Sequence, residues 1–155
     1  MSVIAIIPAR GGSKRIPQKN IKDFCGLPII SYSIKAALES GVFDEVMVST
    51  DSEDIAKIAK KFGAKVPFFR SEKASNDYAT TSEVIMEVLL EYEKRGQYFD
   101  EICCIYPTAP FVTAKKINDA ITVMRSAQAD TVFPIVAYSY PPQSGVIVDE
   151  NGMVV

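Results

Sequence analysis

The first twenty residues constrain the fold most, because a short apolar run stops at a proline and gives way to a polar loop. Residues 3–7 read Val-Ile-Ala-Ile-Ile, and an apolar run of this length predicts a buried strand. The loop at 8–20 contains two glycines and two prolines, which are turn residues that end a strand. The sequence therefore predicts a buried strand at the very start, with a loop leaving its carboxyl end.

Helix and strand patterns alternate along the rest of the chain. Apolar residues at helical spacing predict helices at 28–40, 54–62, 80–95 and 113–127. Apolar runs between them predict strands at 45–49, 65–69, 101–106 and 131–136, and Pro67 suits the second of these to a sheet edge. The strongly apolar run at 101–106 predicts a strand at the centre of the sheet. This alternation predicts an α/β fold, a three-layer α/β/α Rossmann-like arrangement with a mostly parallel sheet.

Length and composition limit the class of protein. A chain of 155 residues fits one domain, 1–155, with a sizeable core. Its net charge of −2 argues against nucleic-acid binding, and no apolar segment approaches membrane-spanning length. Three cysteines without metal-ligand spacing (Cys25, Cys103 and Cys104) favour a reducing, cytoplasmic location. The neighbours Cys103 and Cys104 lie in a predicted strand, and we expect them to have a packing role.

The carboxyl end has the pattern of an unfinished hairpin. Apolar residues at 146–148 and 153–155 flank the turn sequence Asp-Glu-Asn-Gly, and the sequence stops inside the second strand. We therefore expect the carboxyl-terminal part of a longer domain to be missing.

The loop at 8–20 has the chemistry of a phosphate site. Gly11 and Gly12 let backbone N–H groups approach an anion, and four cations surround them: Arg10, Lys14, Arg15 and Lys19. In open parallel sheets, ligands bind at the carboxyl ends of strands, where this loop lies. The same composition is also typical of a solvated surface loop, so both interpretations stay open at this point.

Two further observations narrow the chemistry. Neither the Walker pattern nor the dinucleotide glycine pattern occurs in the chain. The sequence has no histidine, which excludes an imidazole base, a Ser-His or Cys-His pair and a His-ligated zinc within these residues. Chemistry here would depend on cations, carboxylates, hydroxyls and backbone N–H groups, with a metal ion as a further option.

Several ordered motifs resemble the acylneuraminate (CMP-sialic acid) cytidylyltransferases. They are IPARGGSK at 7–14 followed by Lys19-Asn20, GLPII at 26–30, VSTD at 48–51, FR at 69–70 and ND at 76–77. The segments at 103–111 and 133–143 look most like the pseudaminic acid branch. Tyr106, where sialic acid enzymes commonly carry a glutamine, agrees with that branch.

The resemblance implies a reaction and a set of site residues. CMP would pass from CTP to the anomeric hydroxyl of a nonulosonic acid, with release of pyrophosphate and with Mg²⁺ as cofactor. Arg10, Lys14 and Lys19 would be catalytic. The full implied nucleotide-binding set is Ala9, Arg10, Gly12, Ser13, Lys14, Lys19, Asn20, Arg70, Ala79 and Thr81. The resemblance also implies a homodimer, and the metal ligands are not assigned within this chain.

Some residues have a second interpretation. Arg70 also fits an ordinary surface position, and the segment 80–82 also fits a helix cap. Asp51 and Asp77 suit either ligand contact or capping, whereas Arg15 is expected to face water. Two alternative functions also remain, a related sugar nucleotidyltransferase and a non-catalytic nucleotide-binding module.

Overall fold

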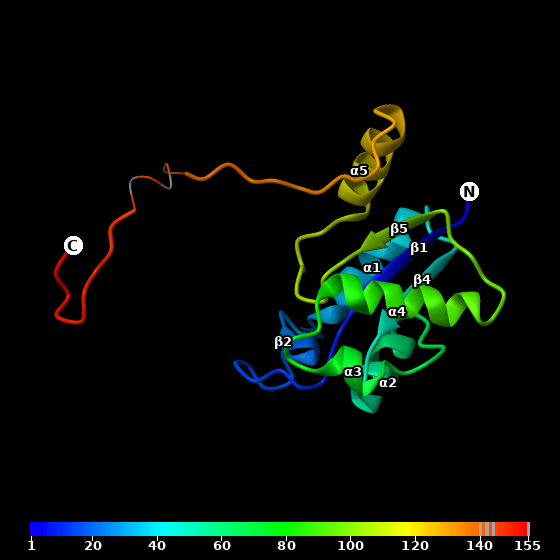
Figure 1. The fold of residues 1–155 in the computed structure, drawn as a ribbon, viewed down its shortest axis with the longest axis horizontal. Helices are drawn as coiled ribbons and strands as arrows, with labels where there is room; N and C mark the ends of the chain where they lie inside the picture. Colours follow the sequence, from blue (N-terminus) through cyan, green and yellow to red (C-terminus); the bar gives the residue numbers. More distant parts are fainter. Residues whose placement is uncertain (140, 142, 144, 155) are drawn as a thin grey trace.

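A three-stranded parallel sheet lies at the centre of the molecule (Figure 1). The computed structural model describes residues 1–139, 141, 143 and 145–154. β1 (Val3–Pro8) is the middle strand, with β4 (Glu45–Ser49) on one side and β5 (Glu101–Cys104) on the other. Ala5 lies opposite both Val46 and Cys103 in these pairings. The predicted parallel sheet and the predicted buried first strand are confirmed. The prediction that the strand at 101–106 lies at the sheet centre is wrong, because β5 ends at Cys104 and pairs with β1 alone, which places it at one edge of the described sheet.

Helices follow the strands close to the predicted ranges. Three short pieces have no counterpart among the predictions, because two to four residues are too few to show a period: η1 (Lys19–Ile21), the ribbon of β2 (Asp23–Phe24) and β3 (Leu27–Pro28), and α3 (Glu72–Ser75). The four predicted helices are α1 (Ile30–Ser40), α2 (Glu53–Lys61), α4 (Thr81–Glu93) and α5 (Ala114–Ser126).

Helices cover both faces of the sheet, as the alternation of β1 requires. Ala5 and Ile7 belong to a buried cluster formed with residues of α1, α2 and α5. Ile4 and Ile6 point to the other face, where they pack against Val88 and Tyr92 of α4. Each of these isoleucines is fully buried, which contributes about 1.5–3 kcal/mol per side chain. The predicted three-layer architecture is confirmed.

Side-chain caps fix where the helices near the sheet edge begin. Ser52 caps α2 by accepting from the Ile55 N–H, as predicted. Thr80 caps α4, and Glu83 completes a reciprocal capping box with it. Thr113 caps α5. These caps satisfy helix N–H groups that have no partner within the helix.

The prediction of a strand at 65–69 is wrong. The segment runs along the outer side of β4 but forms a single parallel bridge, between Lys65 and Met47. Pro67 has no N–H, so the ladder cannot continue through it. The chain returns to the end of β4 at Arg70, whose N–H donates to the carbonyl of Thr50, just after the strand, at 2.9 Å. The predicted edge position is correct, although the regular strand is absent.

The prediction of a strand at 131–136 is also wrong. Residues 130–139 form no strand, and the segment runs away from the sheet, as the orange trace in Figure 1 shows. Phe133, Ile135 and Val136 are exposed. A strand needs a hydrogen-bonded neighbour, and no described strand lies beside this segment. The motif at 139–143 lies partly outside the described residues.

The predicted turn near the carboxyl end forms, although its strands are reduced to one bridge. Val148 and Val154 form an antiparallel bridge. Gly152 has a φ of 82°, which suits glycine in the turn. Val155 lies outside the described residues.

Cys103 packs against the cluster under α1, α2 and α5. Its burial raises the pKa of the thiol to about 11. Cys104 is half-buried, and burial also raises the pKa of its thiol. Among the described residues, no helix is long and apolar enough to cross a bilayer.

A buried phenol anchors α4 to the sheet. The Tyr92 hydroxyl donates to Glu45 Oε1 at 2.9 Å, and Lys65 Nζ lies 2.6 Å from Glu45 Oε2. Burial, together with the adjacent carboxylate, raises the pKa of Tyr92 well above its ordinary value. The phenol therefore stays protonated and keeps donating at neutral pH.

We expect Tyr92→Phe to lower the free energy of unfolding by about 1.5–3 kcal/mol, because a hydrogen bond to a charged acceptor is lost. Urea unfolding measures the change. Because the pKa of Tyr92 is higher in the folded than in the unfolded state, the stability that it contributes is fully present below about pH 10 and decreases as the pH rises further. The difference between the variant and the parent should therefore narrow above that pH. Tyr98→Phe, at an exposed position, is the control, and equal losses in the two variants would contradict the assignment.

Candidate functional site

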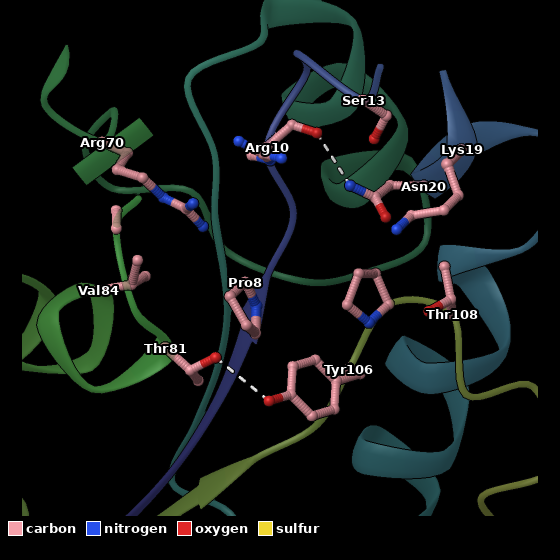
Figure 2. A pocket seen from close by; sticks show the side chains of 12 residues that line it. Pro8, Arg10, Ser13, Lys19, Asn20, Arg70, Thr81, Val84, Tyr106 and Thr108 are labelled. Carbon is pink, nitrogen blue, oxygen red and sulfur yellow. Dashed lines mark hydrogen bonds between the residues drawn. The ribbon is translucent and has the colours of Figure 1, made fainter. Parts of the chain in front are cut away.

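A cavity of about 170 Å³ lies at the carboxyl ends of β1 and β5 (Figure 2). Three parts of the chain form its walls: the loop after β1, the segment from Arg70 to the start of α4, and the turn after β5. The lining residues are Pro8, Arg10, Ser13, Lys19, Asn20, Arg70, Ala79, Thr81, Val84, Tyr106, Pro107 and Thr108.

The structure brings together seven of the ten residues predicted for nucleotide binding. Arg10, Ser13, Lys19, Asn20, Arg70, Ala79 and Thr81 all line the cavity. The other three lie beside it. Ala9 is buried at the end of β1, where its N–H donates to the Ser49 carbonyl at 2.9 Å. Gly12 and Lys14 are exposed on the loop, and Arg15 is also exposed, as expected.

Two hydrogen bonds hold the glycine loop in shape. The Gly11 N–H donates to Asp51 Oδ1 at 2.7 Å, and the buried Asn20 amide donates to the Arg10 carbonyl at 2.9 Å. The backbone at Gly11 also passes very close to α2, since a Cβ added there would lie 2.9 Å from Ser52 Cβ. Only glycine fits at this position without a shift.

Asp51 has a different role from the two weighed for it. Its carboxylate neither caps α2, which Ser52 does, nor lines the cavity. It accepts the Gly11 N–H instead. The residue after β4 therefore fastens the loop after β1, and the two strands are neighbours in the sheet.

Arg70 is a buried cation in the cavity wall, so the surface interpretation is wrong. Its exposed fraction is 8%. Nε donates to Ser49 Oγ at 3.1 Å and Nη2 donates to the Ser49 carbonyl at 2.7 Å. Burial lowers the pKa of the guanidinium, while the nearby carboxylates of Asp51 and Glu87 oppose that shift. A guanidinium has five N–H donors, so it can serve both Ser49 and a ligand.

Arg10 and Lys14 share one carboxylate. Arg10 Nη1 lies 2.8 Å from Asp77 Oδ1 and 3.1 Å from the Asn76 carbonyl oxygen. Lys14 Nζ pairs with Asp77 Oδ2. Hydrogen bonds from Lys14 and then Arg10 lower the pKa of Asp77. Asp77 therefore bridges the loop after β1 and the segment before α4 as an anion.

The turn after β5 contributes residues that the sequence interpretation did not place in the site. The Tyr106 hydroxyl lies 3.2 Å from Thr81 Oγ1 (Figure 2), and the Tyr106 carbonyl accepts from Ser33 Oγ at 2.9 Å. Thr108 lies further along the same turn. A signal was present, because Tyr106 ends the apolar run predicted as a strand and Pro107 follows it, just as the basic loop at 8–20 follows the apolar run of β1. The carboxyl-end argument applies equally to both.

Residues 4–148 match the cytidylyltransferase family. The chain belongs to that family. It is 44% identical over 154 residues, 99% of the chain, to a pseudaminic acid cytidylyltransferase of Campylobacter jejuni. It is 34% identical over 155 residues, the whole chain, to a CMP-N,N'-diacetyllegionaminic acid synthase of Legionella pneumophila. The cytidylyltransferase chain spans 66% of the length of each of these relatives.

Solved structures agree with the fold. The chain resembles a CMP:2-keto-3-deoxy-manno-octonic acid synthetase complexed with CTP, with a TM-score of 0.69 and 25% identity. That match covers 83% of this chain and 49% of the other. A cytidylyltransferase from Leptospira borgpetersenii matches with a TM-score of 0.63, also over 83% of this chain and over 50% of the other, at 24% identity, which supports the fold alone.

The described part of the chain does not by itself fit a magnesium site. No group of three His, Cys, Asp or Glu residues converges anywhere in it. The two carboxylates nearest the basic loop are already engaged, Asp51 by the Gly11 N–H and Asp77 by Arg10 and Lys14. The Mg²⁺ expectation therefore remains a prediction without assigned ligands.

A second and larger hollow, of about 810 Å³, lies beside α3 and α4. Its lining includes the apolar side chains of Phe69, Met86 and Leu90, and Ala79 lines both this hollow and the first cavity. It contains none of the cations predicted to bind phosphate. The basic cavity, not this hollow, matches the chemistry predicted from the sequence.

Proposed function

We propose that this cytidylyltransferase chain binds CTP in the basic cavity and supplies the nucleotide-binding part of CMP transfer to a nonulosonic acid. One observation carries the proposal. Three cations named from the sequence, Arg10, Lys19 and Arg70, line a single cavity at the carboxyl ends of the strands. That edge is where open α/β sheets bind their ligands.

The proposed reaction explains why the cations gather there. The anomeric hydroxyl oxygen of the sugar acid attacks the α-phosphorus of CTP and gives up its proton to solvent, and the bond between that phosphorus and the bridging oxygen to the β-phosphate breaks. Negative charge develops on the α-phosphate oxygens and on the departing pyrophosphate. Preorganised donors placed where charge develops lower the barrier. We assign Lys14 to the transition state and Lys19 to the leaving group.

The remaining predicted residues would hold the nucleotide. Arg10 and Ser13 would contact the triphosphate, and Asn20 would face the nucleoside. Arg70, Ala79 and Thr81 line the opposite wall. There Arg70 would lie near the nucleotide, and Ala79 and Thr81 near the base and ribose, as the family resemblance implies. Arg70 suits this role because its two bonds to Ser49 fix the guanidinium before any ligand arrives.

A sugar acid of the pseudaminic type is the proposed acceptor. Tyr106 at the cavity wall supports it, and so does the similarity to two Campylobacter jejuni relatives named as pseudaminic acid cytidylyltransferases, at 44% and 42% identity. Legionaminic and sialic acids are the competing acceptors. We further propose a Mg²⁺ requirement, a homodimer and a cytoplasmic location.

A pyrophosphate-release assay tests the proposal. CTP and Mg²⁺ are combined with pseudaminic, legionaminic and N-acetylneuraminic acids in turn, and pyrophosphate should appear fastest with pseudaminic acid. Omitting Mg²⁺ tests the metal requirement. Stabilisation of the protein by UTP, ATP or GTP in preference to CTP in a melting experiment would favour a different nucleotidyltransferase. Binding of CTP without release of pyrophosphate would favour a non-catalytic nucleotide-binding module.

A further inference from the structure

One carboxylate occupies two of the cations that the proposed function assigns to the triphosphate. Asp77 Oδ1 accepts from Arg10 Nη1 at 2.8 Å, and Asp77 Oδ2 pairs with Lys14 Nζ. Phosphate oxygens are acceptors of the same kind and would bind the same donors. Asp77 and a triphosphate therefore compete for Arg10 and Lys14.

We propose that Asp77 is a displaceable internal anion, which ties the loop after β1 to the segment before α4 until the triphosphate of CTP takes its place. The inference rests on the proposed function. It adds a residue that opposes binding of the phosphates, where the family resemblance left Asp77 between ligand contact and capping.

The exposure of the three side chains suits an exchange of partners. The Lys14 side chain is 79% exposed, and those of Arg10 and Asp77 are 34% and 37% exposed. Ion pairs exposed to this degree are weak and are screened by salt. Arg70, by contrast, is buried and bound to Ser49, so it stays in place while Arg10 and Lys14 change partners.

Arg10 is also connected to the cavity wall opposite the basic loop. Arg10 also donates to the Asn76 carbonyl oxygen at 3.1 Å. The Asn76 side-chain oxygen accepts from the N–H groups of Tyr78 and Ala79 at 2.8 and 2.9 Å. Ala79 lines the cavity. Release of Arg10 would therefore loosen the turn that shapes the wall opposite the basic loop, so phosphate binding and the shape of that wall are coupled.

The test compares Asp77→Asn with the parent protein by isothermal titration calorimetry. The titrants are CTP, CMP and inorganic tripolyphosphate. Removing the competing charge should tighten the binding of CTP and of tripolyphosphate by about three- to tenfold, with a smaller change for CMP. The gain should shrink at high salt. Glu91→Gln is the matched control, because Glu91 of α4 pairs with two cations that follow the helix, Lys94 and Arg95, and none of the three lines the basic cavity.

The outcomes separate this inference from the proposed function. Equal or weaker binding of tripolyphosphate to Asp77→Asn would overturn the displacement role. Tighter tripolyphosphate binding without any CTP binding would support the displacement role and contradict the proposed function. Failure of both anions to bind either protein would contradict both. A similar gain in Glu91→Gln would show a general charge effect and would also overturn the inference.

Discussion

Lys14→Ala should slow pyrophosphate release from CTP about 10²- to 10³-fold, which is the usual effect of losing one preorganised donor to developing charge. The melting temperature should fall by less than about 4 °C, since an exposed ion pair contributes little to stability. The Lys14 side chain is 79% exposed and pairs with Asp77 alone among the described carboxylates. A steady-state assay with saturating CTP and sugar acid, together with a thermal melt, measures both quantities.

Lys115→Ala is the matched control for Lys14→Ala. Lys115 is 82% exposed and also pairs with one aspartate, Asp119, but lies on α5 away from the cavity. Its loss should leave turnover within about twofold of the parent and change the melting temperature as little. Equal turnover in the two variants would remove Lys14 from the proposed chemistry. A large drop in melting temperature for Lys14→Ala alone would assign the residue a structural role.

Gly11→Ala should have the second large effect, through the shape of the loop. The added methyl group would lie 2.9 Å from Ser52 Cβ, so either the loop or α2 must shift. Overpacking of this kind lowers the free energy of unfolding by about 1–3 kcal/mol, or ~2–4 °C in melting temperature for each kcal/mol. A displacement of the loop by about 1 Å should lower turnover about 10²-fold.

Gly12→Ala controls for adding a methyl group to the same loop. A Cβ at Gly12 would meet no atom within 4 Å, so this variant should keep the melting temperature of the parent. Thermal melts of the two variants side by side isolate the contact with Ser52. If both variants melt alike, the close approach at Gly11 does not limit the loop.

Much of the fold could be predicted because many segments carry a local sequence signal for their own secondary structure. β1, β4 and the four longer helices have strong apolar patterns, and caps such as Ser52 mark where helices begin. The segment at 131–136 carries an equally clear apolar pattern and yet forms no strand. Its outcome depends on a hydrogen-bonded neighbour, which a local pattern does not encode. The segment at 65–69 forms no regular strand despite its apolar pattern, because Pro67 has no N–H to donate.

The site could be predicted in part because open α/β sheets bind their ligands at the carboxyl ends of the strands. The basic loop was found from its residues, and family resemblance added Arg70, Ala79 and Thr81, which line the same cavity. Contacts between segments that are far apart in the sequence could not be predicted. Nothing in the sequence says that Asp51 accepts the Gly11 N–H or that Asp77 holds Arg10, because these pairs are 40 and 67 residues apart. The burial of Arg70 likewise follows from packing beside β4, which its sequence neighbours do not reveal.

The bond between Asp51 and Gly11 has a consequence for anyone who redesigns this protein. It joins the loop after one strand to the residue after the neighbouring strand, so the pairing of β1 with β4 sets where the loop stands. The loop after β1 could therefore not be grafted alone onto another scaffold with its shape preserved. A transplant would have to carry both strands, in their native alignment, together with the first turn of α2.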